Sequence, residues 1–261
     1  MSKSYASAYI AHLTQERRPP NTIAATRRVL RSLPDADTAT REDVEAWWAS
    51  RSHLSPATRS NDLAILRTFY AWCRRWEHRD DDPTLRIDAP KVPRGLPRPM
   101  SRADLTRLLP TLPDDLRRAV CLGAYGGLRV SEAAALTWHD VDLETRRVRV
   151  LGKGGKTRLV GMSPLLLDEL LPDAGGNVVT AGGAPYSASA LQRRVNRAIR
   201  AAGVDCTYHQ LRHRFGTVAL AATGNLLAVS RAMGHASPAT TAIYAATSDA
   251  DLDVIADAVT R

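Results

Sequence analysis

The spacing of apolar residues changes within one segment, Arg147-Val-Arg-Val-Leu-Gly-Lys-Gly-Gly-Lys-Thr-Arg-Leu-Val160, and this change indicates the fold class. Residues 147–151 and 157–160 alternate polar with apolar side chains, which is typical of strands with one buried face. A flexible glycine-rich turn, Gly152-Lys-Gly-Gly-Lys156, separates them, so we predict a β-hairpin. Helical spacing on both sides of the hairpin predicts a mainly α protein with a small antiparallel β-sheet or hairpin.

Helical patterns with clear start signals occupy the rest of the chain. Thr40-Arg-Glu-Asp43 fits a capping box with Asp in place of the usual Glu, and Ser55-Pro56 offers an N-cap followed by proline at N1. Asn21 is expected to cap another helix. Further helices are expected over residues 4–17, 101–109, 114–125, 130–136, 163–171, 187–202, 208–222, 225–233, 238–246 and 249–260.

A proline-rich stretch, Ile87-Asp-Ala-Pro-Lys-Val-Pro-Arg-Gly-Leu-Pro-Arg-Pro99, interrupts these helices. Proline lacks an amide hydrogen and clashes with the preceding helical turn, so the stretch favours an extended, semi-rigid connector. We therefore predict a helical domain over 1–88, a basic linker over 89–99, a second domain over 100–247 and an acidic C-terminal helix over 248–261.

The composition favours a protein with a polyanionic partner. The chain has 36 Lys and Arg against 27 Asp and Glu, a net charge of +9, and nucleic acid is the simplest partner for such an excess. A basic protein without that partner is the alternative. We see no secretory signal and no run of about 18 apolar residues that would cross a membrane. Three widely spaced cysteines, Cys73, Cys121 and Cys206, favour a reducing cytosol over a disulfide framework.

Two stretches of the second domain combine glycine with basic side chains. Tyr125-Gly-Gly-Leu-Arg-Val-Ser-Glu132 places Arg129 at a helix start, where amides and a guanidinium suit a phosphate; a surface arginine paired with Glu132 is the alternative. The hairpin turn holds Lys153 and Lys156, two of the four lysines of the chain. A lysine can be tuned to give up a proton near neutral pH, whereas arginine cannot, so a general acid and a solvated turn are both open interpretations.

Two further stretches carry histidine or tyrosine. Tyr208-His-Gln-Leu-Arg-His-Arg-Phe-Gly216 places His209, Arg212 and His213 on one helix face, which fits phosphate binding with acid–base help. Gln210 stands where a zinc protease needs its base, which argues against a zinc hydrolase. For His213 a packed helix histidine is the favoured interpretation. In Met233-Gly-His-Ala-Ser-Pro-Ala-Thr-Thr-Ala-Ile-Tyr244 the final tyrosine, taken alone, is ordinarily a core or rim residue.

The four stretches together are more specific than any one of them. In order they contain G-L-R-x-S-E, G-K-G-x-K, H-x-L-R-H, G-H-x-S and a tyrosine nine residues after that histidine. This order resembles the tyrosine recombinases of the phage-integrase family over about residues 120–246. Ser55-Pro-Ala-Thr58 and Arg67-Thr-Phe-Tyr-Ala-Trp72 are similar to the family's core-binding domain. Met233 and Gly216 stand where the family usually has Leu and Ala.

The resemblance implies a two-domain recombinase, with a helical core-binding domain and a catalytic domain but no arm-site-binding domain. It implies site-specific cleavage and rejoining of DNA strands through a 3′-phosphotyrosyl intermediate, without metal or ATP. Carried over by position, Arg129 and Arg212 would clamp the non-bridging oxygens of the scissile phosphate. Tyr244 would attack the phosphorus. The alternative function is a sequence-specific DNA-binding protein without strand transfer; a relaxing topoisomerase of related chemistry is a third.

The same resemblance assigns the remaining site residues and no cofactor or metal. Lys153 would protonate the leaving 5′ oxygen, His209 would assist proton transfer at the nucleophile, and His235 would hydrogen-bond the phosphate. Glu132 would support these groups from behind. We expect the arginines among residues 27–31, together with Arg59 and Arg67, to include DNA contacts.

The expected partners are double-stranded DNA, a homotetramer on paired sites and accessory DNA-bending proteins, in the cytoplasm and at the nucleoid of a bacterial host. Segment 248–261 has four Asp against one Arg, and Leu252, Ile255 and Val259 share one helical face. The resemblance implies that this segment docks on a neighbouring protomer; folding back on its own domain is the alternative.

Overall fold

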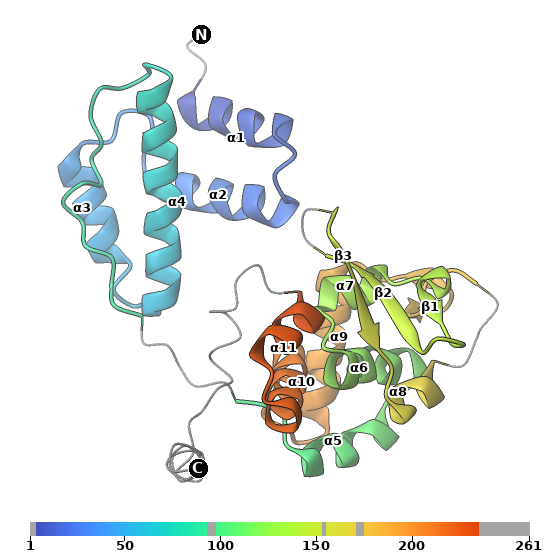
Figure 1. Cartoon of the computed structure of the whole chain (residues 1–261). Coiled ribbons are helices and arrows are strands. Elements are labelled where there is room, and N and C mark those ends of the chain that lie inside the picture. The colour runs from blue at the N-terminus through green and yellow to red at the C-terminus, as the bar shows by residue number, and fades with distance from the viewer. Residues whose placement is uncertain (1–3, 93–97, 153–154, 171–174, 235–261) are drawn as a thin grey trace, which may run out of the picture. The chain divides into compact units, whose positions relative to one another are not determined.

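The computed structural model of the 261-residue chain describes residues 4–92, 98–152, 155–170 and 175–234 (Figure 1). The chain divides into two compact units, Met1–Gly95 and Leu96–Arg261. The helices expected over 238–246 and 249–260 lie outside the described residues. Within the described ranges, no helix has both the length and the apolar character that a bilayer crossing needs.

The N-terminal unit is entirely helical in its described part. Its elements are α1 (Tyr5–Gln15), α2 (Pro20–Ser32), α3 (Arg41–Ser50) and α4 (Pro56–Arg75). The 20-residue α4 carries the centre of the core, because Leu63, Leu66, Phe69, Tyr70 and Cys73 are fully buried. The helices α1 and α2 pack against α4 and against each other, so one apolar cluster holds the unit together.

The predicted caps of α3 and α4 are confirmed. The Thr40 hydroxyl accepts a hydrogen bond from the Asp43 amide at 3.2 Å, and the Asp43 carboxylate accepts one from the Thr40 amide at 2.9 Å. The Ser55 hydroxyl accepts from the Thr58 amide at 3.2 Å. The expected cap at Asn21 is wrong: α2 begins at Pro20, whose ring already holds the helical φ that the first position needs.

The C-terminal unit combines helices with two small sheets. Its helices are α5 (Arg102–Leu108), α6 (Asp114–Gly126), α7 (Val130–Ala135), α8 (Pro164–Glu169), α9 (Ala188–Ala201), α10 (Tyr208–Thr223) and α11 (Leu226–Met233), with 3-10 turns η1 (Leu109–Thr111) and η2 (Trp138–Asp140). Its strands are β1 (Val141–Asp142), β2 (Arg147–Leu151), β3 (Thr157–Gly161), β4 (Thr180–Ala181) and β5 (Ala184–Pro185).

The predicted β-hairpin is confirmed. Strands β2 and β3 pair antiparallel from Arg147↔Gly161 to Leu151↔Thr157, and Val148, Val150 and Val160 are buried as the alternation requires. The structure adds β1 at the edge of this sheet, in the order β1-β2-β3, and a separate β4-β5 pair. These additions were not predicted because a strand of two residues is too short to show a period of two.

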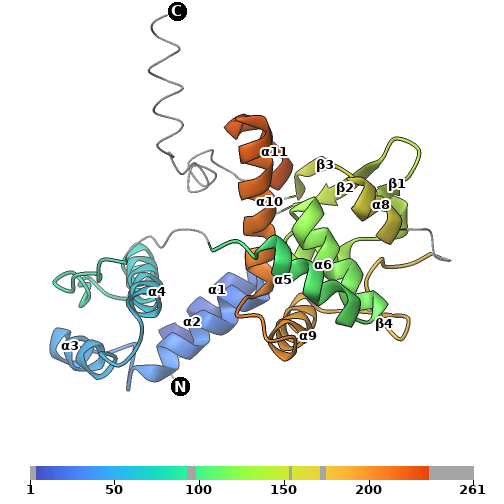
Figure 2. The same ribbon diagram turned by 90° about the horizontal axis from the view of Figure 1, so that it is seen from below.

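The centre of the C-terminal unit is the packing of α6 against α10, which lie side by side in both ribbon views (Figures 1 and 2). Helices α8 and α9 also pack on α6, and α11 packs on α10. Leu122, Leu128, Leu166, Leu191 and Leu211 are fully buried in the shared apolar cluster. This core fixes the C-terminal end of α6 beside α10, and the candidate site lies at that point.

Candidate active site

Arg129 is positioned by the sharp break between α6 and α7. Gly127 ends α6 with φ +65°, a left-handed conformation that favours glycine. A Cβ at Gly127 would lie 2.5 Å from the Phe215 ring of α10, so side-chain space as well as backbone conformation selects glycine. Leu128 is buried, and Arg129 then becomes the N-cap residue of α7. The Gly-Gly break thus presents Arg129 at the start of a helix, as the sequence predicted.

Glu132 connects three guanidinium groups. Its carboxylate accepts hydrogen bonds from the Arg129 amide and Nη1, both at 2.8 Å, and from Nη1 and Nη2 of Arg158, both at 2.8 Å. Arg212 Nη1 lies 4.0 Å from Glu132 Oε2. Burial would raise the pKa of Glu132, but the bonds from Arg158 and Arg129 together hold the pKa below its ordinary value. We call these four residues the Glu132 cluster.

Arg212 is the most deeply buried guanidinium of this cluster, with 3% of its side chain exposed. From α10 it donates to Gly127 O at 2.5 Å and to Met233 O at 2.6 Å. Arg129 donates to Gly234 O at 2.9 Å and to Met233 O at 3.4 Å. The structure therefore brings Arg129 and Arg212 together, and both hold the carbonyl oxygens at the C-terminal end of α11.

The surroundings of Arg129 fit both interpretations, phosphate binding and pairing with Glu132. Arg129 forms an ion pair with Glu132, as the structural alternative expected, and 38% of its side chain is exposed. Arg129 and Arg212 both donate to Met233 O at the end of α11, and two converging guanidinium groups suit an anion. The ion pair holds the guanidinium in place and does not bury it.

His209 and His213 form a pair on α10. Their ring centroids are 4.4 Å apart, with an edge-to-face angle of 78°. Burial lowers the pKa of His209, and the charges of Arg212 and Arg129 lower it further. Burial, His209 and Arg212 lower the pKa of His213 to about 4. At neutral pH both rings are therefore uncharged.

Lys153, His235 and Tyr244 lie outside the described residues, so the structure shows only the described residues that adjoin their segments. Gly152, directly before Lys153, donates from its amide to Lys156 O at 2.8 Å and closes the base of the hairpin turn. Gly234, directly before His235, has φ +64°, and its carbonyl oxygen accepts a hydrogen bond from Arg129. Among the described residues, no group of three or more His, Cys, Asp or Glu side chains is arranged to hold a metal ion.

Arg158 is a site residue to which the sequence analysis gave no role. Besides its two bonds to Glu132, its Nε donates to Ala232 O of α11 at 2.8 Å, and only 11% of its side chain is exposed. The signal was its register: Arg158 pairs with buried Val150 and shares a strand face with buried Val160. An arginine on the buried face of a strand indicates a paired guanidinium.

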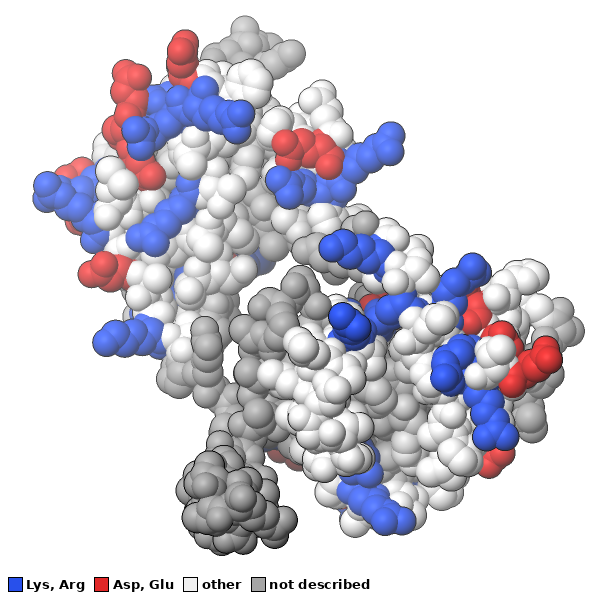
Figure 3. All heavy atoms as spheres, in the orientation of Figure 1, with Lys and Arg blue, Asp and Glu red and all other residues white. Residues whose placement is uncertain are grey.

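Basic side chains also lie on the N-terminal unit, where the structure sorts the candidates for DNA contacts. Arg28 pairs with buried Asp62 at 2.6 Å, Arg59 stacks 4.2 Å from the Trp48 ring centroid, and Arg67 donates to Ile87 O at 2.5 Å. These three arginines have structural partners. Figure 3 shows the surface distribution, with Lys and Arg interspersed with Asp and Glu on the visible face of each unit.

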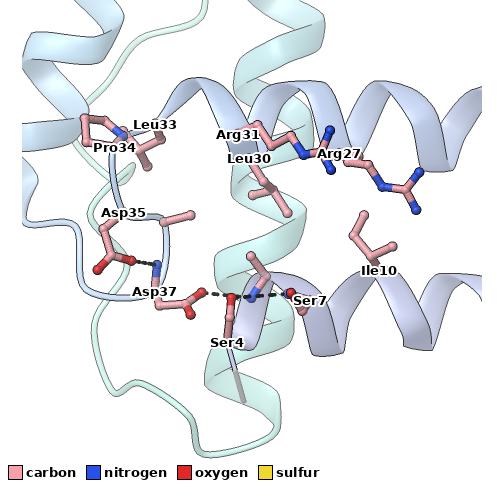
Figure 4. A pocket seen from close by; sticks show the side chains of 12 residues that line it. Ser4, Ser7, Ile10, Arg27, Leu30, Arg31, Leu33, Pro34, Asp35 and Asp37 are labelled. Carbon is pink, nitrogen blue, oxygen red and sulfur yellow. Dashed lines mark hydrogen bonds between the residues drawn. The ribbon is translucent and has the colours of Figure 1, made fainter. Parts of the chain in front are cut away.

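Arg27 and Arg31 are exposed on α2 and line a pocket of about 530 Å³ between α1, α2 and the loop over residues 33–37 (Figure 4). They are one helical turn apart, so they project from the same side of α2. Two acidic residues line the opposite end of the pocket, and both have hydrogen-bond donors. The Asp37 carboxylate accepts from the Tyr5 and Ala6 amides at 2.9 and 2.8 Å, and the Asp35 carboxylate accepts from the Asp37 amide and the Thr38 hydroxyl at 3.0 and 2.7 Å. The pocket thus presents basic character on its α2 side.

Comparison with known proteins places this geometry in a family. Residues 100–251 match the phage integrase family. The chain is 35% identical to the tyrosine recombinase XerC of Xanthomonas campestris pv. campestris strain B100, covering 90% of this chain and 82% of XerC. It is 36% identical to XerD of Xanthomonas axonopodis pv. citri, covering 76% of this chain and 74% of XerD. The fold is similar to that of the Tn1549 transposon integrase in complex with transposon right end DNA, with a TM-score of 0.77, 18% identity and coverage of 99% and 100%.

Proposed function

The chain belongs to the phage integrase family, and on that premise we propose how its residues carry out strand exchange. The protein is a site-specific tyrosine recombinase, which cleaves and rejoins DNA through a 3′-phosphotyrosyl intermediate. Because the covalent link conserves the energy of the phosphodiester bond, rejoining needs no ATP. We assign the core-binding role to residues 1–88, the linker to 89–99 and catalysis to 100–247.

Arg129 and Arg212 bind the non-bridging oxygens of the scissile phosphate. The observation that supports this role most directly is their convergence from α7 and α10 at the end of α11, immediately before His235. A phosphodiester repels nucleophiles because it is negatively charged, and two guanidinium groups neutralise that charge. They also stabilise the additional charge of the pentavalent transition state.

His209 accepts the proton of the nucleophile, Tyr244. A tyrosine hydroxyl has an ordinary pKa near 10, so at neutral pH it needs a base when it attacks. His209 is suited to this role because burial and the charges of Arg212 and Arg129 lower its pKa and keep the ring neutral. The two arginines thus have two roles: they bind the phosphate, and their charges lower the pKa of His209.

Lys153 donates a proton to the 5′ oxygen that leaves, and His235 hydrogen-bonds the phosphate. Lys153 belongs to the turn between β2 and β3, and β3 is tied to the Glu132 cluster through Arg158. His235 directly follows Gly234, whose carbonyl oxygen is bound by Arg129. These connections support the assignment of both residues to the site of Arg129.

The partner is double-stranded DNA, and the working assembly is a homotetramer on two paired sites in the bacterial cytoplasm, at the nucleoid, with accessory DNA-bending proteins. Segment 248–261 docks on a neighbouring protomer. The exposed apolar side chains of Val218 on α10 and Leu227 on α11, 51% and 59% exposed, offer a surface for its apolar residues. Covering these side chains removes apolar area from water and stabilises the assembly.

A covalent adduct distinguishes the recombinase from a protein that only binds DNA. The target site is selected from a random-sequence duplex pool by the wild-type protein, and duplexes nicked at successive positions of that site serve as suicide substrates. We expect the wild-type protein to form a protease-sensitive protein–DNA adduct that resists denaturing electrophoresis. Tyr244→Phe keeps the same affinity for the site but forms no adduct. An adduct with the variant would show that another residue is the nucleophile, and no adduct with either protein would favour the binding-only alternative.

A further inference from the structure

Arg158 is the dominant partner of Glu132. Its Nη1 and Nη2 each donate to a different oxygen of the carboxylate, both at 2.8 Å, in the bidentate geometry that makes Arg–carboxylate pairs strong. Arg129 reaches the same carboxylate with its Nη1 alone, at 2.8 Å, apart from its backbone amide. Its Nη2 turns instead toward Gly234 O. The Arg158 guanidinium therefore donates two hydrogen bonds to Glu132, whereas the Arg129 guanidinium donates one.

The unequal sharing has an electrostatic consequence. Glu132 is 5% exposed, so water does little to screen its charge, and its interaction with a guanidinium is stronger than at a surface. If Glu132 paired with Arg129 alone, it would cancel the positive charge that the phosphate needs. With Arg158 bound to both oxygens, the negative charge of Glu132 is already compensated, and it offsets less of the positive field of Arg129.

Arg158 does not reach the phosphate itself. Only 11% of its side chain is exposed, and its three nitrogen atoms donate to Ala232 O and to the two oxygens of Glu132. A Cβ added at Gly234 would lie 2.9 Å from its Nη1, and one added at Gly152 would lie 3.7 Å away. The guanidinium is therefore packed between the base of the lysine turn and the end of α11. Any effect it has on the reaction passes through Glu132 and these contacts.

We propose that Arg158 is a positioning residue for strand cleavage: it compensates the negative charge of Glu132, so that the positive field of the Arg129 guanidinium is available to the scissile phosphate, and it helps to hold that guanidinium in place. This inference rests on the proposed role of Arg129. It goes further in assigning an electrostatic task to an arginine that does not touch the DNA.

The first test removes the charge of Arg158 and then removes the charge that it compensates. Arg158→Met keeps the unbranched stem of the side chain but removes the guanidinium. Glu132 then pairs with Arg129 alone, and we expect single-turnover cleavage of the pre-bound nicked duplex to slow by about 100-fold, as if the Arg129 donor itself were lost. Adding Glu132→Gln should restore at least about 10-fold of that loss, because no buried carboxylate then offsets the charge of Arg129. Arg149→Met is the matched control: Arg149 is an exposed arginine of neighbouring strand β2, paired with Asp140 at 3.0 Å, and its rate should stay within about twofold of wild type.

The second test asks whether charge or packing is responsible. A duplex with a methylphosphonate at the scissile position lacks the negative charge of one non-bridging oxygen. On this substrate the defect of Arg158→Met should shrink to a few-fold, because little charge remains to be neutralised. If Arg158 only holds α11 in place, Arg158→Met has the same defect on both substrates and Glu132→Gln does not rescue cleavage. That result would overturn the proposal.

Folding and the role of Arg129 are checked separately. Where Arg158→Met lowers the melting temperature by more than a few degrees, Arg158→Lys replaces it, since lysine keeps a positive charge beside Glu132 but cannot form the bidentate pair. Its smaller defect should show the same dependence on the phosphate charge, and equal defects on the two substrates would contradict the proposal. If Arg129→Met leaves cleavage intact, the proposed function of Arg129 is wrong, whatever Arg158 does.

Discussion

At the scale of single residues, the same side chain often satisfies the fold and the chemistry together. Arg129 pairs with Glu132, binds the end of α11 and still keeps 38% of its side chain exposed. Arg212 is buried, and its guanidinium joins the end of α6 to the end of α11 through Gly127 O and Met233 O. A buried arginine is costly unless its donors are used, so these bonds to carbonyl oxygens allow a charge to stay inside the unit.

The role of Lys153 is tested by changing the leaving group. Lys153→Ala should slow cleavage of the nicked site duplex by about 10²–10⁴-fold, the usual range for losing a general acid. A 5′-bridging phosphorothioate should restore the rate, because a thiolate leaves without taking up a proton. Lys156→Ala on the other side of the turn is the control and should cleave both substrates like wild type. Rescue of Lys156→Ala in place of Lys153→Ala would identify Lys156 as the acid.

The pKa of His213 predicts how stability depends on pH. Burial, with His209 and Arg212 nearby, lowers the pKa to about 4, whereas the unfolded chain titrates near the ordinary value of 6.5. Between these values the unfolded chain binds more protons than the folded one, so stability falls as pH falls from about 6.5 to about 4. We expect His213→Leu to weaken this acid dependence in melting temperatures measured from pH 4 to 7. Parallel curves for the variant and the wild type would contradict the shift.

Sequence reasoning at this scale identified arginine and histidine residues that the structure brings together, but not Arg158. The motifs containing Arg129, His209 and Arg212 are local, and each keeps its spacing on one helix or at one turn. The role of Arg158 depends on three contacts that are distant in sequence, to Glu132 on α7 and to the end of α11. Its position on the buried face of β3 was visible in the alternation, but its partners were not.

At the scale of elements, the break between α6 and α7 requires glycine at position 127, and this requirement can be tested. Gly127 and Gly224 both end helices with positive φ, 65° and 60°, but only Gly127 has a neighbour, the Phe215 ring at 2.5 Å from an added Cβ. Gly224→Ala should cost about 1–2 kcal/mol for the left-handed conformation alone. Gly127→Ala should cost about 1–3 kcal/mol more, because the methyl group overpacks the site.

The two glycine variants are compared by denaturant unfolding of the full chain and by cleavage of the nicked duplex. We expect Gly127→Ala to lose cleavage activity even under conditions where it is folded, because Arg129 follows two residues later. Gly224→Ala should retain activity. Equal stability losses in the two variants would show that the Phe215 contact relaxes at no cost.

The elements that sequence predicted correctly are those with a strong local signal. The capping box at Thr40, the Ser55-Pro56 helix start and the β2–β3 hairpin depend on residues within one or two turns of chain. The two-residue strands β1, β4 and β5 depend instead on tertiary pairing, which leaves no period in the sequence. Asn21 was misassigned because two prolines, Pro19 and Pro20, precede it and Pro20 already starts the helix.

At the scale of the whole molecule, net charge relates sequence to function. The excess of 36 basic over 27 acidic residues predicted a polyanionic partner, and membership of the phage integrase family supports DNA in that role. Charge alone did not indicate which arginines serve the partner and which serve the fold. The structure adds that Arg28, Arg59 and Arg67 have partners within the N-terminal unit, so these three arginines contribute to the fold.

Arg27 and Arg31 therefore predict the salt dependence of DNA binding. Both are exposed on one side of α2, and a lysine or arginine that neutralises a phosphate releases counterions from the DNA. Each phosphate contact contributes about 0.9 to the slope of log affinity against log salt concentration. Replacing both arginines by glutamine should reduce the slope by about 1–2, with a uniform loss of affinity across sequences. The measurement is fluorescence anisotropy of the selected duplex between 50 and 300 mM salt, roughly the range over which such slopes are determined.

Arg41 gives a matched control for this measurement. It is an exposed arginine of the same unit, but it already pairs with Glu45 at 3.2 Å on α3, so Arg41→Gln should leave the slope unchanged. A slope that falls equally in Arg41→Gln and in the double variant would show that only the net charge of the protein matters. A slope that falls in the double variant alone places the DNA backbone along the exposed side of α2, because counterion release counts local contacts and not total charge.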